Sequence, residues 1–336
     1  MTSSLMPATE LEALVGQAIE ASDTSKANAA SVARALVQAE IDGQGGHGLS
    51  RVATYSAQAR SGKVNGRAVP VLKQTRPGAI MIDVKGGFAY PAFDLAIAEL
   101  PKLAAANGIA AAGFFHSHHA GVVGLHVERL AEAGLVALAF SNTPHAMASW
   151  GGKRSIFGTN PIGFAAPQRG EPPIVVDLAL SHVARGKIMT AAQKGQPIPE
   201  GWAVDENGKP TTDAKAALKG TLIPLGGAKG SALALMVEVL AVALTGANFG
   251  AEAASFLDAE GPSPGVGQML IVIDPGAFAG RDVFLERIGA LAGMIGDDAG
   301  ARLPGSRRLA LRAAAKHDGV SIDDAMLGKI RAIAVG

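Results

Sequence analysis

The most informative absences in this sequence concern cysteine, charge of one sign and long apolar runs. No cysteine occurs among the 336 residues, which excludes disulfides, thiolate metal sites, iron–sulfur clusters and a cysteine nucleophile. Thirty basic and 29 acidic residues leave a formal charge of +1 without a long run of either sign. A nucleic acid or an anionic membrane would therefore find no charged surface to bind, and we expect neither as a partner.

No segment predicts export or membrane insertion. The first basic residue is Lys26, so the N-terminus lacks the charged start of a signal peptide. The best apolar run, Ala232–Leu244, is interrupted by Glu238 and is shorter than the about twenty residues of a membrane span. We therefore expect a cytoplasmic protein.

Glycine, in contrast, is in excess. The 43 glycines fall in short clusters such as Gly43–Gly48 and Gly226–Gly230 without a repeat, which excludes a collagen-like or low-complexity chain. Glycines placed in this way indicate tight turns or close approach of the backbone to a ligand. Hydrophobic residues at 48% and charged residues at 18% predict a globular protein of about two domains.

The hydrophobic pattern predicts a mixed α/β fold. Thr9 and Glu12 have the spacing of a capping box at the start of a first helix, and a second helix is expected over Ser25–Ile41. Further helices are expected over Pro91–Asn107, Gly121–Ala133 and Ser231–Leu244. Short buried strands are expected over Ala79–Val84, Ile109–Phe115, Leu135–Ser141, Pro173–Leu178 and Met269–Ile273. The polar stretch Gln193–Lys219 indicates a long excursion or a lid.

The histidines suggest a single site region that moves protons. Seven of the eight lie between His47 and His182, and imidazole is the side chain that exchanges protons near neutral pH. Gly43, Gly45 and Gly48 fit the dinucleotide pattern G-x-G-x-x-G. That pattern requires a preceding strand, and a helix precedes it here, so we interpret the loop as one that presents His47 and Arg51. His47 could move a proton there, and Arg51 could hold a carboxylate.

The segment HSHHAG, residues 116–121, brings three histidines close in sequence. Neighbouring residues of a strand point to opposite faces and no HExxH motif follows, so we predict no metal site. His119 is the histidine that we expect beside a bound anion, because the small residues Ala120 and Gly121 follow it.

Three glycine- or proline-containing turns are further candidates. Gly158–Pro161 can be a simple tight corner or part of a site. The segment LGGAKGS at 225–231 could bind a phosphate or a carboxylate through backbone amides and Lys229. Arg302, Arg307 and Arg308 surround Pro304-Gly305, and they could hold a phosphate or form a solvated basic turn.

Taken together in order, seven segments resemble the type-2 malate/L-lactate dehydrogenase family of NAD(P)-dependent oxidoreductases. This family includes ureidoglycolate and sulfolactate dehydrogenases and reductases of cyclic imino acids. The resemblance covers about residues 10–310 and is carried by DGQGGHGLSR (42–51), HSHHAGVVG (116–124), SNTPHAMASWGG (141–152), GTNPIGFAAP (158–167), VVDLALSHVARGKI (175–188), PTTD (210–213) and the segment 225–250.

The resemblance implies a homodimer with a nicotinamide-binding fold that is not the Rossmann fold and has a largely antiparallel central sheet. A helical segment, 1–70, would carry the His47/Arg51 loop and pack with the C-terminal part, 285–336. Residues 71–284 would form the α/β domain that binds the cofactor, NAD or NADP, and the substrate.

The resemblance also implies roles for individual residues. His47 matches the proton-donor position, with His119 and Lys187 as further catalytic candidates, and Arg51 and Thr159 match substrate-binding positions. The positions that match cofactor contacts are His119, Ala120, Gly121, Val122, Val123, Asp177, Leu178, Ala179, Lys229, Pro304, Gly305, Arg307 and Arg308.

Three positions depart from the family pattern. Gly46 stands where the family usually has serine before the motif histidine, and Lys187 stands where the cyclic imino-acid reductases have an acidic residue. Both changes weigh against imine reduction. Ala120 replaces phenylalanine and should enlarge the pocket beside His119.

The function predicted from the sequence is hydride transfer between nicotinamide and C2 of a small 2-hydroxy or 2-oxo acid such as malate, lactate or sulfolactate. Reduction of Δ1-pyrroline- or Δ1-piperideine-2-carboxylate is the alternative within the family. A ligand-binding relative without catalysis and a metal hydrolase built on the histidines are the alternatives outside it.

Overall fold

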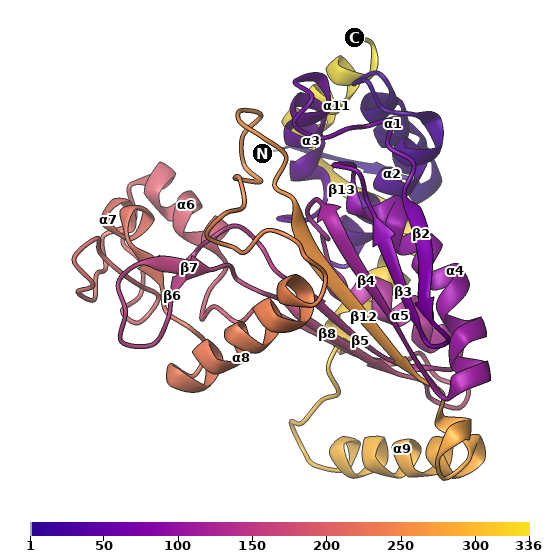
Figure 1. The fold of residues 1–336 in the computed structure, drawn as a ribbon. Coiled ribbons are helices and arrows are strands. Elements are labelled where there is room, and N and C mark those ends of the chain that lie inside the picture. Colours follow the sequence, from indigo (N-terminus) through magenta and orange to yellow (C-terminus); the bar gives the residue numbers. More distant parts are fainter. Residues whose placement is uncertain (1) are drawn as a thin grey trace.

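The computed structural model describes residues 2–336 and has a mixed α/β architecture around a seven-stranded sheet (Figure 1). The order of the sheet is β2 (Val71–Arg76), β3 (Ala79–Asp83), β4 (Ile109–Ser117), β12 (Val266–Ile273), β5 (Val136–Ser141), β8 (Ile162–Ala166) and β9 (Ile174–Leu178). Only the β3–β4 pair is parallel among its described strands, and the other five pairs are antiparallel. A mixed sheet of this kind needs no repeated strand–helix–strand unit.

Helices cover both faces of this sheet. On one face, α4 (Ala89–Asn107) and α5 (Val123–Glu132) form a continuous apolar cluster with the strands, including Phe93, Phe114 and Leu130. On the other face lies α8 (Ala228–Glu238), which continues into a π-helical turn, η2 (Val239–Ala243), packed on β12. The central strand β12 is therefore buried over most of its length, as its run of apolar residues requires.

The two ends of the chain meet in a helical layer at the top of Figure 1. It contains α1 (Ala8–Glu20), α2 (Lys26–Ile41), η1 (Leu49–Arg51), α3 (Val52–Arg60), α10 (Ser306–Asp318), α11 (Asp324–Ala334) and the strand pair β1 (Ser3–Met6) and β13 (Val320–Asp323). Leu11, Leu36 and Tyr55 share one apolar cluster with Ile322 and Ile330. Residues more than 250 positions apart in sequence thus form a single core.

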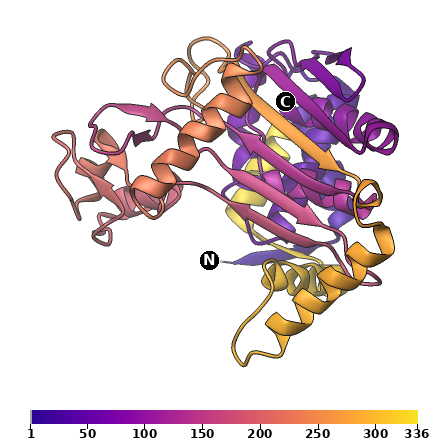
Figure 2. The same cartoon turned by 60° about the horizontal axis from the view of Figure 1, so that its bottom comes forward.

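A small lobe projects beside the sheet, with α8 between the two (Figure 2). It consists of β6 (Met147–Ala148), β7 (Ser155–Phe157), α6 (Arg185–Lys194), β10 (Ala203–Val204), α7 (Ala214–Lys219) and β11 (Thr221–Leu222). The predicted polar excursion, Gln193–Lys219, lies within this lobe. The remaining elements, the turn η3 (Pro275–Ala277) and α9 (Arg281–Gly296), follow β12.

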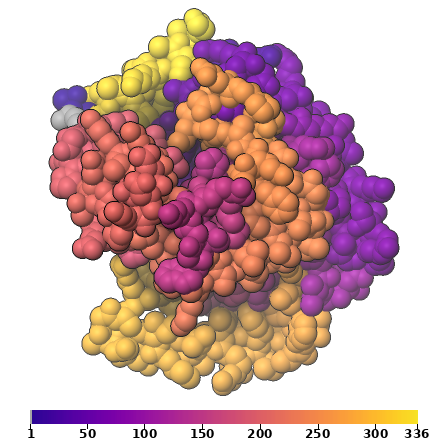
Figure 3. All heavy atoms as spheres, turned by 60° about the vertical axis from the view of Figure 1, so that its left-hand side comes forward, coloured from indigo at the N-terminus to yellow at the C-terminus, as the bar shows by residue number. Residues whose placement is uncertain are grey.

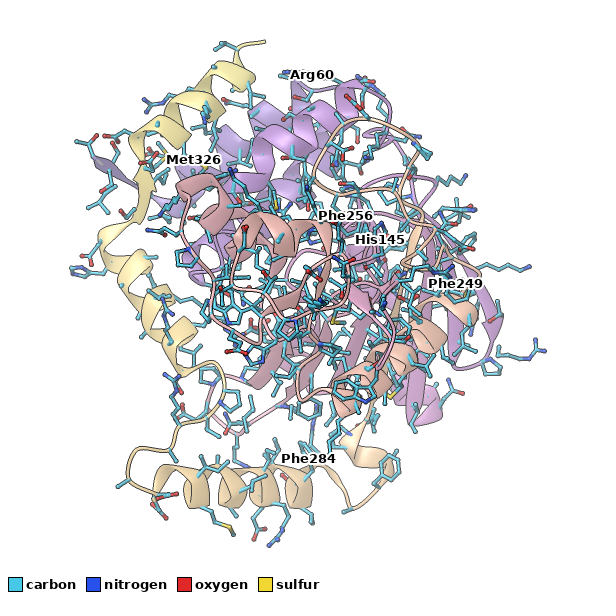
Figure 4. All side chains as sticks on the ribbon, turned by 90° about the vertical axis from the view of Figure 1, so that its left-hand side faces the viewer. Arg60, His145, Phe249, Phe256, Phe284 and Met326 are labelled. Atoms are coloured by element: carbon cyan, nitrogen blue, oxygen red, sulfur yellow. The ribbon has the colours of Figure 1, made fainter. Side chains whose placement is uncertain are left out.

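Helix α9 stands apart from the body and has no buried residue (Figure 4, Phe284). The exposed fraction is 50% for Leu291 and 64% for Met294.

Most predicted elements are present with shifted ends, but the predicted start of the first helix is wrong. The N-cap of α1 is Pro7, and no side chain caps the helix. Thr9 and Glu12 lie inside the helix, where the capping-box geometry does not form. Ser25, in contrast, caps α2 by accepting a hydrogen bond from the Asn28 N–H.

A buried network of charges joins the N-terminal layer, the sheet layer and the C-terminal helix α10. Arg312 on α10 donates to both carboxylate oxygens of Asp42, at 2.7 and 2.8 Å, and to Glu128 on α5 at 2.7 and 2.9 Å. Arg308 adds a 3.1 Å bond to Glu128. Asp42 immediately precedes the glycine loop that begins at Gly43, so this network fixes where the loop begins.

Candidate active site

A cavity of about 1040 Å³ lies where the loop after α2, the start of α5, the end of β9 and the small lobe converge. Its lining contains a large share of the predicted site: His47, Arg51, His119, Ala120, Gly121, Val122, Thr159, Asp177, Leu178, Ala179 and Lys187. Figure 3 shows this face of the molecule, with the small lobe beside the loop that follows α8. These residues come from segments up to 140 positions apart in sequence and meet only in the fold.

His47 and Arg51 lie one turn apart, on either side of the start of η1. The Arg51 Nε–H donates to the Gly46 carbonyl oxygen at 2.7 Å, which orients the guanidinium group. The His47 Nδ1 atom is buried and has no hydrogen-bond partner among the described residues. Burial, followed by the Arg51 charge, lowers the pKa of His47 to about 4. At neutral pH the imidazole is therefore uncharged and can accept a proton.

Gly46 has room for the side chain that the family usually carries there. A Cβ atom built at this glycine meets nothing within 4 Å. The absence of serine is therefore not forced by packing around the loop. Gly48 is different, because its Cβ would lie 2.3 Å from a Glu40 carboxylate oxygen. That carboxylate accepts the Leu49 N–H at 2.9 Å and so needs the space.

His119 stacks against His47, with ring centroids 5.1 Å apart and planes inclined by 27°. Its Nδ1 atom is 2.6 Å from the hydroxyl oxygen of Tyr55 on α3. Phe256, labelled near the centre of Figure 4, packs on the opposite side with a centroid distance of 4.9 Å. Burial and then the neighbouring His47 and Arg51 keep the pKa of His119 well below its ordinary value.

The other histidines of the predicted region do not line the cavity. His118 is fully buried behind it, and His126 stacks on Phe93 in the core with a centroid distance of 3.7 Å. His116, His145 and His182 are exposed elsewhere. Among residues 2–336, no group of three or more His, Asp or Glu side chains is arranged to hold a metal ion. The concentration of histidines in sequence therefore corresponds to only two at the cavity.

Thr159 is held in the cavity wall by Thr143, whose hydroxyl oxygen accepts the Thr159 N–H at 2.9 Å. Asn160 follows with a φ of +42°, a left-handed conformation that asparagine tolerates better than most residues. Behind this corner, the buried Glu238 accepts hydrogen bonds from Asn160 at 3.0 Å and from Asn142 at 3.5 Å. Glu238 sits at the junction of α8 and the π-helical turn, a distortion frequent near functional sites.

Asp177 at the end of β9 faces the start of α5. Burial raises the pKa of its carboxyl to about 6, against the opposing hydrogen bonds of Gln44 and the Gly124 N–H. Gly124 must remain glycine here, because its Cβ would lie 2.9 Å from the Asp177 Cβ. Gly121 adopts a φ of +67°, and its Cβ would lie 2.5 Å from the Tyr90 hydroxyl. The backbone at the start of α5 therefore comes unusually close to its neighbours.

A second cavity of about 360 Å³ shares Gly43 and Gln44 with the first. It is lined by the predicted turn Pro304–Arg308 and by Arg302. Arg308 is buried and bonded to Glu128, so its charge is already neutralised by protein. Arg302 and Arg307 are exposed. These two arginines are the cations that this cavity offers to an anion.

Lys187 and Lys229 occupy different positions. Lys187, in the first turn of α6, lines the large cavity. Lys229, in the first turn of α8, is exposed and lies outside the described lining of both cavities. Val123 is the first residue of α5. Pro304 lies in the arginine turn that lines the second cavity.

The two adjoining cavities fit an elongated dinucleotide. The large one exceeds the usual volume of small-molecule pockets, and two of its lining residues, His47 and Gln44, each have a buried polar side-chain atom without a described hydrogen-bond partner. The smaller one supplies arginines, which bind phosphates through planar pairs of N–H groups. A ring with a hydrogen-bonding amide would fit beside the histidines, and the phosphates would lie toward Arg302 and Arg307.

Comparison with known proteins assigns the chain to a family. The sequence profile of malate/L-lactate dehydrogenase matches residues 6–331. The chain belongs to the malate/L-lactate dehydrogenase family. It is 48% identical to the (2R)-3-sulfolactate dehydrogenase (NADP(+)) of Chromohalobacter salexigens, with 97% of each chain covered. It is also 42% identical to a Δ1-pyrroline-2-carboxylate/Δ1-piperideine-2-carboxylate reductase of Pseudomonas aeruginosa, over 92% of this chain and 93% of the relative.

A solved structure agrees with this assignment. The Δ1-piperideine-2-carboxylate reductase from Pseudomonas syringae superposes with a TM-score of 0.89 at 37% identity, over 98% of this chain and 99% of that one. The predicted family and the predicted enzyme class, an NAD(P)-dependent oxidoreductase, are confirmed. No helix within residues 2–336 is long and apolar enough to cross a membrane.

The sequence reasoning missed several residues that shape the site of this family member. Tyr55 lies outside every predicted motif, Glu238 was noted only as a charge in an apolar run, and Gln44, Thr143 and Leu257 line the cavity without having been singled out. Glu238 did leave a signal, since it is a single charge inside an otherwise apolar helical run. A buried charge of that kind requires hydrogen-bond partners, and these are Asn142 and Asn160.

A substitution tests the proton-transfer role of His47. We expect His47→Asn to lower kcat by about 10²–10⁴-fold, the usual contribution of a general acid or base, because asparagine cannot take the substrate proton. His116→Asn is the control, since His116 is exposed and its φ of +49° suits asparagine. Steady-state kinetics decide the matter, and full turnover by the His47 variant would exclude the role.

The raised pKa of Asp177 predicts a pH effect on stability. The folded-state pKa, about 6, lies above the ordinary value of 3.8, so folding favours the protonated form. Stability from this group is therefore present below about pH 4 and is lost as the pH rises to about 6, by up to about 3 kcal/mol relative to Asp177→Asn. Denaturant unfolding across this pH range measures it, with the exposed Asp282→Asn as control. Equal pH slopes for wild type and Asp177→Asn would contradict the expectation.

Proposed function

We propose that the protein is an NADP-dependent dehydrogenase of a small 2-hydroxy acid that carries a second anionic group, of the type of 3-sulfolactate or malate. The observation that carries this proposal is the charge of the large cavity. Of its described lining residues, Arg51 and Lys187 are the only Lys or Arg side chains, and Asp177 is the only acidic one. Because burial raises the pKa of Asp177, its negative charge is weakened. Two cations in one pocket favour a substrate with two negative groups.

Arg51 would hold the substrate carboxylate with its two terminal nitrogens, since its Nε is already bonded to Gly46. This contact fixes the C2 carbon relative to His47, four residues earlier in the chain. Lys187, on the α6 side of the cavity, would hold the second anionic group of the substrate. Thr159 would complete the substrate pocket from the wall opposite the glycine loop.

His47 would take the hydroxyl proton in oxidation and return it in reduction. Without a substrate carboxylate, Arg51 helps to keep His47 uncharged. A substrate carboxylate on Arg51 offsets that positive charge, so substrate binding raises the pKa of His47 toward neutrality. The nicotinamide cofactor supplies the hydride acceptor or donor for C2. The small lobe, whose residues Ile198, Pro199 and Trp202 line the cavity, would limit the access of water.

The cofactor would bind across the two cavities on a fold that differs from the Rossmann fold. Ala120–Val123 and Asp177–Ala179 would contact its nicotinamide half. Gly305 and Arg307 would contact its phosphates, with the exposed Arg302 beside them. A 2′-phosphate adds negative charge that these arginines can accept, which supports NADP. The relative at 48% identity is named as an NADP(+) enzyme. Lys229 lies outside both cavities. It would contact the cofactor only after a movement of α8 or from a second subunit.

Reduction of cyclic 2-imino acids is the second candidate, because relatives at 42% identity and below are named for that reaction. The cyclic imines carry a single carboxylate, which leaves Lys187 without a partner. The family's reductases of cyclic imino acids carry a serine and an acidic residue at the positions where this chain has Gly46 and Lys187. The charge of the cavity therefore favours the dianionic hydroxy acid.

A substrate panel with a Lys187 variant tests the proposed specificity. We expect kcat/KM for 3-sulfolactate or malate to exceed that for lactate. Lys187→Ala should lower the former by about 10- to 100-fold, as loss of a charge-assisted contact worth about 1.5–3 kcal/mol predicts. Lactate turnover should change little. Lys194→Ala, on the same helix and outside the described cavity lining, is the control.

Two results of this panel would refute the proposal. One is preference for Δ1-pyrroline- or Δ1-piperideine-2-carboxylate over every hydroxy or oxo acid tested. The other is an equal loss of kcat/KM with lactate and with sulfolactate in Lys187→Ala, which would show that the lysine does not bind the second anionic group. Running the panel with both NADPH and NADH also tests the proposed choice of cofactor.

A second copy of this chain would cover the apolar side chains that the single chain leaves exposed. They include Leu235, Met236 and Val239 around α8 and Val283, Leu291 and Met294 on α9. Exposed apolar surface on this scale marks an interaction site in most proteins. The division into residues 1–70 with 285–336 and residues 71–284 would then describe each protomer of a cytoplasmic homodimer.

Sedimentation velocity tests the proposed dimer. We expect a species of twice the 33.9 kDa chain mass, and Leu291→Glu with Met294→Glu should shift it toward the monomer by placing charge in the interface. Leu257→Glu, at an exposed site on a different loop, is the control for apolar surface in general. A wild-type chain that sediments as a monomer at micromolar concentration would exclude this arrangement.

A further inference from the structure

A chain of buried hydroxyl groups extends from His119 into the protein interior. The Tyr55 hydroxyl oxygen is 2.6 Å from His119 Nδ1 and 3.2 Å from the Tyr90 hydroxyl oxygen. The exposed fractions are 0% for Tyr55, 3% for Tyr90 and 6% for His119. The sequence contains only two tyrosines, and both belong to this chain of groups. Neither was expected in the site from the sequence.

The hydrogen bonds of this chain of groups have one favoured direction. Tyr90 has no hydrogen-bond partner other than the Tyr55 hydroxyl among the described residues. If Tyr90 donates to Tyr55 and Tyr55 donates to His119 Nδ1, both hydroxyl hydrogens are used. In the reverse direction the Tyr90 O–H would be buried without an acceptor, an arrangement that proteins avoid. His119 Nδ1 is therefore the acceptor, and the ring hydrogen is on Nε2.

We propose that Tyr55, supported by Tyr90, is a positioning residue that fixes His119 as the Nε2–H tautomer and thereby makes it a hydrogen-bond donor to an oxygen of the bound ligand. His119 borders the cavity, and its Nδ1 side faces Tyr55. The Nε2–H on the other side of the ring is then the group that His119 offers to a ligand. His47, stacked on it, remains the group that takes and returns the proton.

The surroundings of His119 support a neutral donor. The charged and titratable groups around it are His47 and Arg51 from the loop and η1, Tyr55 from α3, and His118 beside it on the chain. None of them is an acid that would stabilise an imidazolium. Two neighbouring imidazoles cannot both be charged at low cost, so the roles divide between a proton-transferring His47 and a neutral His119. A fixed tautomer is what allows such a histidine to donate from one defined nitrogen.

The prediction for turnover rests on the proposed function, whereas the tautomer is a property of the chain alone. In Tyr55→Phe the ring stays in place and only the hydroxyl is lost. We expect kcat to fall by about 10- to 100-fold, as when other outer hydrogen bonds to functional histidines are removed, with KM changed much less. Tyr90→Phe should have a smaller effect, because Tyr55 can still donate to His119.

The decisive measurement is NMR of the full chain labelled with ¹⁵N in histidine, with the His119 signals identified by their loss in His119→Asn. We expect the Nε2–H tautomer in the wild type between pH 6 and 8, and a mixture of tautomers in Tyr55→Phe. Ser56→Ala is the matched control, because Ser56 is buried on the same helix and its hydroxyl has no described partner. It should keep both the tautomer and kcat, and thermal melts should confirm that each variant is folded.

Two outcomes overturn the inference. The first is a wild-type His119 with its hydrogen on Nδ1. The second is a folded Tyr55→Phe protein with an unchanged tautomer, whatever its activity, since a loss of activity would then have a structural cause. If no acid in the panel is turned over, the proposed function fails, while the tautomer and its dependence on Tyr55 still decide this inference.

Discussion

The buried contact of Arg312 with Asp42 and Glu128 is the interaction on which the site depends. It joins three segments that are far apart in sequence: the end of α2, the middle of α5 and the helix α10. The side chains of Asp42 and Glu128 are almost fully buried, so neither carboxylate can be left without its cation. The glycine loop begins directly after Asp42, and α5 begins beside the segment that we propose contacts the cofactor. A charge network far from the reacting atoms thus sets the distance between the two walls of the cavity.

From this junction, the charges of the site divide into two groups. Arg308 and Arg312 form ion pairs with buried acidic side chains, so their charges are neutralised within the protein. Arg51 and Lys187, together with the exposed Arg302 and Arg307, are left for ligands. Arginine therefore has two roles within this short segment: Arg308 is paired with acidic side chains, whereas its neighbour Arg307 is exposed. Burial and the presence of an acidic partner distinguish them, and neither property can be seen in the sequence.

The sequence predicted the fold class and part of the cavity lining because these depend on local pattern and on motif order. The second helix was predicted to begin at Ser25, whose hydroxyl caps α2 in the structure, and His119 was chosen over its neighbours because small residues follow it. The failed expectation at Thr9 and Glu12 shows the limit of local pattern. Pro7 already fixes the backbone at the start of the helix, so the capping box does not form.

What could not be predicted depends on contacts between distant segments. Tyr55 reaches His119 across 64 positions and Glu238 reaches Asn142 across 96, and no spacing rule connects them. Arg308 lies in the turn that the family resemblance matches to cofactor contacts, and its hydrogen bond to Glu128 joins residues 180 positions apart. The seven histidines were expected together, and the alternation of β4 and the packing of α5 turn most of them away from the cavity.

The central claim is that this cavity transfers hydride between a nicotinamide cofactor and C2 of a small acid. It is tested most directly with NADPH that carries deuterium at the transferable C4 position, incubated with the enzyme and 3-sulfopyruvate. Mass spectrometry and NMR of the product should find one deuterium per molecule, bonded to C2. A product without deuterium, or deuterium released to water during turnover, would contradict the account.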